Sequence, residues 1–157
     1  MESTPGTRKV LVAIDDSEAS TRVAEFVNRF FGGLDVEIIA INVGPVARAA
    51  VPYGTAFPGL ELGGGLVGPL TMVGPEGATA SRLQDSEDII DRSPLHEDER
   101  VVEVGDPVEV IERAAEELDV DLVVVGTEHK GLLDRLLSKS VAAALVRSSP
   151  RPVLVVH

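Results

Sequence analysis

Residues 121–157 have the sequence DLVVVGTEHKGLLDRLLSKSVAAALVRSSPRPVLVVH, and this stretch decides the fold. Residues 122–125 and 153–156 are short apolar runs without polar alternation, a pattern typical of strands that are covered on both faces. Gly126 predicts a turn after the first run, and the residues between the two runs predict a helix. This order indicates a parallel sheet, and open α/β sheets bind their ligands at the carboxyl edge, where the first loop lies.

The rest of the chain repeats this alternation of strands and helices. Apolar runs bounded by turn residues predict three more strands, at residues 9–14, 36–43 and 99–104. The third of them is rather polar and suits an edge of the sheet. We therefore expect one α/β domain over residues 1–157, with a doubly wound, open parallel sheet, helices on both faces and a short tail at residues 1–8.

The helix expected over residues 18–31 follows three residues with short side-chain oxygens, Asp15, Asp16 and Ser17, which suit a helix start. Five apolar residues fall at helical spacing and are expected to face the sheet, namely Ala19, Val23, Phe26, Val27 and Phe30. Gly32 and Gly33 are expected to end this helix, because glycine adopts the left-handed conformation at little cost.

Residues 44–79 differ from everything around them. They include nine glycines and five prolines, and their charged residues are Arg48, Glu61 and Glu76. Such a composition disfavours a regular helix, so a short helix at residues 80–92 is all that we expect before the third strand. The segment is either a mobile loop or a flap or contact surface whose leucines gain by being covered.

Composition and charge exclude several classes of protein. The chain has no cysteine, and it lacks both an apolar run of 18 residues and the apolar core of a signal peptide. A soluble cytoplasmic protein is therefore expected. The net charge of −12 argues against binding to nucleic acid or to an anionic membrane. Residues 126–157 carry five basic and two acidic side chains, which indicate either a place for a phosphate or a solvated helix face.

The last third of the chain resembles the end of a universal stress protein. The nucleotide loop of that family has the pattern Gly-x-x-Gly, nine residues, Gly-Ser/Thr, which begins at Gly126 and ends at Ser140 of this chain. Residues 9–18 are similar to the family's first strand and its Asp-x-Ser-Glu turn, and residues 104–107 resemble its junction between third strand and third helix. The resemblance implies five strands in the order 3-2-1-4-5.

The same resemblance implies a site for ATP or AMP. Asp15 would bind the ribose, although a carboxylate in this place also suits a turn or helix cap. The backbone of Val43 would meet the adenine, and Gly126 would let the chain pass close to the phosphates. The resemblance adds four more residues to this site, Ala13, Thr127, Ser140 and Val141, the last two through N–H groups at a helix start.

Two motif glycines are replaced in this chain. His129 stands at the second glycine and would adopt a left-handed conformation at a cost of about 1 kcal/mol. Lys139 stands at the third, where its side chain either fills the space that a phosphate needs or contacts the phosphate as a point charge. Lys139 therefore also belongs to the predicted nucleotide site.

The sequence does not predict an enzyme. No Gly-x-Ser-x-Gly motif is present, and no cluster of ligands has a spacing recognised for metals. We expect a regulatory or stress-response module that binds an adenine nucleotide. The alternatives are a nucleotide-independent dimeric adaptor that acts through contacts with a regulatory protein, or a slow ATPase. The apolar last strand is expected to pair with its copy in a homodimer, which the resemblance also implies.

Overall fold

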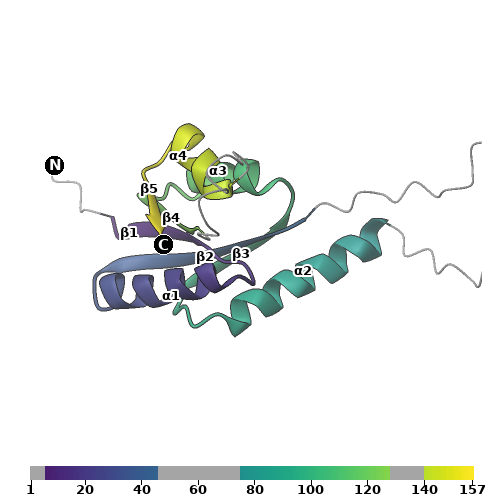
Figure 1. Cartoon of the computed structure of the whole chain (residues 1–157), viewed down its shortest axis with the longest axis horizontal. Coiled ribbons are helices and arrows are strands. Elements are labelled where there is room, and N and C mark those ends of the chain that lie inside the picture. Colours follow the sequence, from purple (N-terminus) through teal and green to yellow (C-terminus); the bar gives the residue numbers. More distant parts are fainter. Residues whose placement is uncertain (1–5, 46–74, 128–139) are drawn as a thin grey trace, which may run out of the picture.

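Five parallel strands form one sheet in the order β3-β2-β1-β4-β5, which confirms the expected fold class and strand order (Figure 1). The computed structural model describes residues 6–45, 75–127 and 140–157. The strands are β1 (Arg8–Ala13), β2 (Val36–Gly44), β3 (Glu99–Val104), β4 (Leu122–Gly126) and β5 (Val153–Val156).

The four helices of the described residues cover the two faces of the sheet. Figure 1 shows α1 (Glu18–Phe31) and α2 (Pro75–Arg92) on one face, and α3 (Pro107–Glu117) and α4 (Val141–Ser148) on the other. The first two connections run from the centre to one edge and the last two run toward the other edge. Because each crossover is right-handed, this reversal moves the helices to the opposite face. Each face buries its own apolar cluster.

Helix α1 is fixed to the sheet by a narrow apolar stripe. Ala19, Val23 and Val27 are buried as predicted, but the prediction for Phe30 is wrong, because this side chain is 53% exposed. Phe30 falls between Ala19 and Val23 around the helix axis, but it lies in the last turn of α1, beyond Val27, the last buried residue of the helix. The Phe30 ring stacks on Phe26, also of α1, with a centroid distance of 4.3 Å.

Two other predictions about segment boundaries needed correction. Helix α2 begins at Pro75, five residues before the expected start at residue 80, so the end of the segment 44–79 is helical. Proline suits the first turn of a helix, because its missing N–H group has no partner there. Strand β2 also extends through Gly44. The remainder of the segment, residues 46–74, and the first five residues of the expected tail lie outside the described residues.

Gly126, the last residue of β4, lies directly under α1. A Cβ atom at this position would come within 3.0 Å of Val23 Cγ2 and 3.1 Å of the carbonyl carbon of Ala19. The helix therefore packs closely on the end of β4 only because residue 126 has no side chain.

We expect Gly126→Ala to lower the free energy of unfolding by about 1–3 kcal/mol, because the new methyl group forces α1 away from the sheet. Urea denaturation measures the difference. Gly6→Ala is the matched control, since a Cβ there would meet nothing within 4 Å and its effect should stay below about 0.5 kcal/mol. Equal stability of the two variants would contradict the close packing of α1 on β4.

Candidate functional site

Most of the predicted site residues meet at the carboxyl edge of the sheet. Ala13 ends β1 and pairs with Ile41 of β2, which places the end of β1 two residues before the level of Val43. Gly126 ends β4, the other neighbour of β1. Chain connections leave β1 and β4 toward opposite faces of the sheet, so the crevice of this doubly wound fold lies between these two strands.

The carboxylate of Asp15 follows the end of β1 and is held through one oxygen. Asp15 Oδ1 accepts hydrogen bonds from the Ser17 N–H at 2.9 Å, from the Ser17 hydroxyl, and from the Ser20 hydroxyl at 2.5 Å. The Ser17 hydroxyl also caps α1 by accepting from the Ser20 N–H at 3.3 Å. Asp15 therefore does form part of the turn that starts α1. Within the described residues, all hydrogen bonds to this carboxylate go to Oδ1 and Oδ2 has none, and Asp15 is exposed.

These hydrogen bonds set the charge of Asp15. Partial burial alone would raise the pKa of its carboxyl group, but the hydrogen bonds from Ser17, Ser20 and the backbone outweigh burial and lower the pKa below the ordinary value of 3.8. Asp15 is therefore ionised at neutral pH, and its free oxygen acts only as an acceptor.

Two buried polar residues support this edge, and the sequence reasoning missed both. Ser20 is 6% exposed and contacts Asp15 twice, because its hydroxyl also accepts from the Asp15 N–H at 2.8 Å. Asn42 is 4% exposed, and its Nδ2 donates to the carbonyl oxygen of Ile14 at 2.6 Å. The signal that could have found Asn42 is a polar residue at the buried end of β2, between Ile41 and Val43.

The end of β4 is occupied largely by contacts within the protein. The Thr127 N–H donates to the carbonyl oxygen of Val156 at 3.0 Å, so it is not available to a ligand. Gly126 packs against α1, as described above. Neither residue therefore needs a nucleotide to explain its backbone position, although both lie at the predicted edge.

Ser140 and Val141 form the start of α4, as the sequence predicted. Ser140 is the N-cap, and its hydroxyl accepts from the Ala143 N–H at 3.4 Å. Because a helix between parallel strands runs opposite to them, α4 begins at the carboxyl edge, and the N–H groups of its first residues have no partner within the helix. The predicted residues His129 and Lys139 lie outside the described residues.

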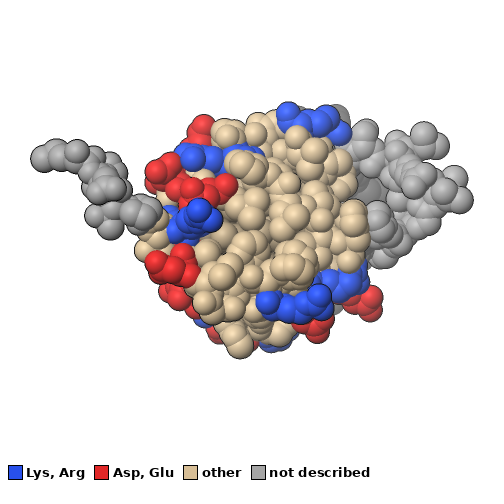
Figure 2. Space-filling view, turned by 90° about the vertical axis from the view of Figure 1, so that its left-hand side faces the viewer, with Lys and Arg blue, Asp and Glu red and all other residues tan. Residues whose placement is uncertain are grey.

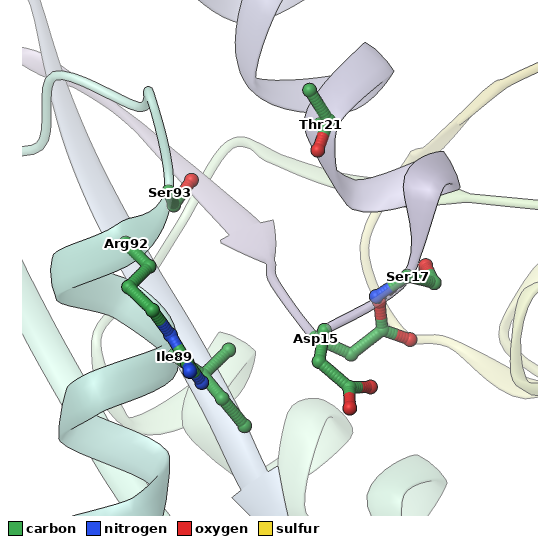
Figure 3. Close-up of a pocket in the computed structure, with 7 residues that line it drawn as sticks. Asp15, Ser17, Thr21, Ile89, Arg92 and Ser93 are labelled. Atoms are coloured by element: carbon green, nitrogen blue, oxygen red, sulfur yellow. Dashed lines mark hydrogen bonds between the residues drawn. The ribbon is translucent and has the colours of Figure 1, made fainter.

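A cleft of about 270 Å³ lies beside Asp15, between the start of α1 and the end of α2. Figure 3 shows Asp15, Ser17 and Thr21 on one side of it and Ile89, Arg92 and Ser93 on the other. The Arg92 side chain is held to its own helix, because Nε donates to the carbonyl oxygen of Asp88 at 3.1 Å. Of the predicted nucleotide residues, Asp15 alone lines this cleft, which opens on the α1 and α2 face.

The described residues contain neither a metal site nor a membrane span. In residues 6–45, 75–127 and 140–157, no group of three or more His, Asp or Glu side chains is placed to hold a metal ion. No helix in that part of the chain is long and apolar enough to cross a membrane.

Comparison with known proteins identifies the family of this chain and agrees with its fold. The model of the universal stress protein family matches residues 67–157, more than half of the chain. The chain belongs to the universal stress protein family. A Staphylococcus haemolyticus protein named as a universal stress protein is 35% identical over 76 residues, which cover 48% of this chain and 46% of that protein. The match between the two chains therefore spans less than half of the relative's length.

Solved structures share the fold. UspA from Lactobacillus plantarum aligns with a TM-score of 0.63 at 16% identity and covers 96% of this chain and 98% of its own. A universal stress protein in complex with cAMP aligns with a TM-score of 0.59 at 22% identity and covers 96% of this chain and 97% of its own. A universal stress protein family protein from Arabidopsis thaliana with AMP bound aligns with a TM-score of 0.54 at 17% identity and covers 95% of this chain and 90% of its own. At these identities the likeness shows the shared fold.

The lowered pKa of Asp15 gives a prediction about stability and pH. Because the folded pKa lies below the ordinary value of 3.8, the hydrogen bonds to the ionised carboxylate stabilise the protein fully above that pH, and this contribution is lost as the pH falls through the folded pKa. We expect Asp15→Asn to have a lower free energy of unfolding than wild type at pH 7, and the difference to shrink below pH 3.8.

Urea denaturation between pH 7 and pH 3 measures this difference. Asp35→Asn is the control. Asp35 is exposed just before the amino end of β2, and it accepts no hydrogen bond from the described residues. A difference between wild type and Asp15→Asn that stays constant over the whole pH range would contradict the assignment.

Proposed function

We propose that this universal stress protein is a non-catalytic regulatory module of the stress response that binds an adenine nucleotide, ATP or AMP, at the carboxyl edge of its sheet. The observation that carries the proposal is Asp15, an ionised carboxylate at the crevice between β1 and β4, whose Oδ1 is held by three donors while Oδ2 remains for a ligand. The related structures that contain cAMP or AMP support the choice of an adenine nucleotide.

In the proposed complex, each part of the nucleotide meets a group suited to it. Asp15 Oδ2 accepts hydrogen bonds from the ribose hydroxyls. The base lies near the end of β2, beside the Val43 backbone. The phosphates lie toward the N–H groups at the start of α4, since a helix N-terminus attracts anions. A contribution from Lys139 remains a prediction from the sequence.

We expect Asp15→Asn to weaken the binding of ATP and AMP about tenfold, the loss of one charge-assisted hydrogen bond. Asparagine can keep an acceptor toward Ser17 and Ser20 but replaces the outward oxygen by an NH₂ donor, which repels a ribose hydroxyl proton. Isothermal titration calorimetry on nucleotide-stripped protein measures the affinities, with Asp35→Asn as the control of equal charge change.

Two outcomes would contradict the proposal. Failure of the wild-type protein to bind ATP, ADP or AMP would favour the nucleotide-independent adaptor. Sustained hydrolysis of ATP by the purified protein would show an enzyme instead of a non-catalytic module.

We further propose that the protein forms a homodimer through β5. The two edges of the sheet differ in chemistry. At the β3 edge, Arg100 pairs with Asp91 at 2.7 Å and Glu97 at 2.5 Å, and Glu103 pairs with Arg113. Charged edges of this kind resist pairing with another chain. Strand β5 carries only apolar, half-buried residues over Val153–Val156, so a second copy of this strand covers it best.

The surface charge fits a protein partner better than nucleic acid or a membrane. Figure 2 shows a broad uncharged surface on the side that lies to the left in Figure 1, with acidic and basic side chains at its margins. The C-terminal end of α1, which carries Arg29 and the exposed Phe30, lies on this side. The visible face therefore lacks the extended basic patch that a phosphate backbone or an anionic lipid surface needs.

We expect wild-type protein to be a dimer at micromolar concentration and Val155→Lys to give monomers or insoluble protein, because Val155 lies on the pairing strand and also packs against an apolar cluster of its own chain, where a charge lacks water. Light scattering measures the molar mass. Leu34→Lys is the control, since Leu34 is 58% exposed and precedes β2, which β1 and β4 separate from β5. A monomeric wild-type protein would overturn this proposal.

A further inference from the structure

Ser20 is a buried polar residue whose side-chain hydrogen bonds both go to Asp15. It lies in the first turn of α1 and is 6% exposed. Its hydroxyl accepts from the Asp15 N–H at 2.8 Å and donates its single proton to Asp15 Oδ1 at 2.5 Å. The Ser20 hydroxyl thus connects the backbone of Asp15 to its own carboxylate and fixes the side-chain torsion of that residue.

The two carboxylate oxygens of Asp15 are made unequal by this contact. Oδ1 receives the Ser20 proton together with the N–H and the hydroxyl of Ser17, which is more than the two lone pairs of one oxygen can serve. Oδ2 has no donor among the described residues. A ligand at this edge therefore meets one oxygen with two free lone pairs at a fixed position.

We propose that Ser20 is a specificity-determining residue, which holds Asp15 so that Oδ2 recognises the 2′- and 3′-hydroxyls of a ribonucleotide together. The proposal rests on the proposed function. Two hydroxyl donors on adjacent carbons match the two lone pairs of a single oxygen. A 2′-deoxynucleotide lacks one of these donors, and a 3′,5′-cyclic nucleotide lacks the other. The site therefore favours AMP over both analogues.

A purely structural role for Ser20 would give a different result. Burial requires that the hydroxyl find partners, and Asp15 satisfies that need whether or not a ligand binds. In that case, removal of the hydroxyl would change stability and leave the discrimination between nucleotides unchanged. If Ser20 acts through Asp15, its removal leaves only Ser17 to hold Oδ1, so the position of Oδ2 is less well fixed and the preference for the diol falls.

The neighbouring Thr21 provides a matched control. It lies in the same turn of α1 and lines the cleft beside Asp15, but its side chain is exposed and makes no hydrogen bond to that carboxylate. Figure 3 shows Thr21 one turn along the helix from Ser17, with Arg92 across the cleft. Asp16 and Arg92, the other charged residues that line this cleft, remain unchanged in both variants.

The test measures the affinities of AMP, 2′-deoxy-AMP and 3′,5′-cyclic AMP by calorimetry for the full-length wild type, Ser20→Ala and Thr21→Ala. We expect wild type to bind AMP about tenfold more tightly than either analogue, the value of one hydrogen bond. In Ser20→Ala this ratio should fall to about twofold or less, mainly through weaker AMP binding, whereas Thr21→Ala should keep the wild-type ratio. If Ser20→Ala fails to fold, Ser20→Cys, a close isostere with a weak donor, replaces it.

Several outcomes would overturn the inference, and they can be told apart. Binding without discrimination in wild type, or full discrimination in Ser20→Ala, refutes the role of Ser20 and leaves the proposed function standing. No binding of any nucleotide refutes both. The hold of Ser20 on Asp15 is tested without ligand by an NMR titration of the Asp15 carboxyl carbon. The pKa should rise in Ser20→Ala and stay unchanged in Thr21→Ala, and an unchanged pKa in both would refute the contact itself.

Discussion

The central strand β1 is the constraint on which the rest of this structure depends. Leu11 faces one apolar cluster, and Val10 and Val12 face the other, so a six-residue strand contributes to both cores. It is also paired on both sides, with β2 and β4. Because the chain must leave β1 toward one edge and return to its other side later, the end of this strand is where the two faces diverge.

The turn after β1 solves a local problem of hydrogen bonding in a way that prepares a site. The first N–H groups of α1 need acceptors, and Ser17 and Asp15 supply them from side chains short enough to reach. The same contacts occupy one oxygen of Asp15 and keep the carboxylate ionised. The same hydrogen bonds therefore cap the start of α1 and leave Oδ2 of Asp15 as an acceptor at the crevice.

Sequence reasoning found the fold because buried parallel strands leave unmistakable apolar runs, and it placed Asp15, Val43 and Gly126 correctly at one edge. It failed for residues whose burial or hydrogen bonds depend on neighbouring elements of the folded chain. Phe30 is exposed although its spacing suits burial, because it lies in the last turn of α1, beyond the last buried residue of that helix. Ser20 and Asn42 were missed because their importance lies in partners that only the folded chain brings close.

Gly126 shows why a motif residue does not by itself indicate a ligand. The family pattern explains this glycine by a phosphate that approaches the backbone, but here the backbone and side chains of α1 already occupy the space of a Cβ atom. Helix packing would select glycine at this position even in a chain that binds nothing. Asp15 differs, because the turn requires only one of its oxygens, and the second is left at the crevice with no partner in the described chain. Asp15 therefore supports the proposed nucleotide more strongly than Gly126 does.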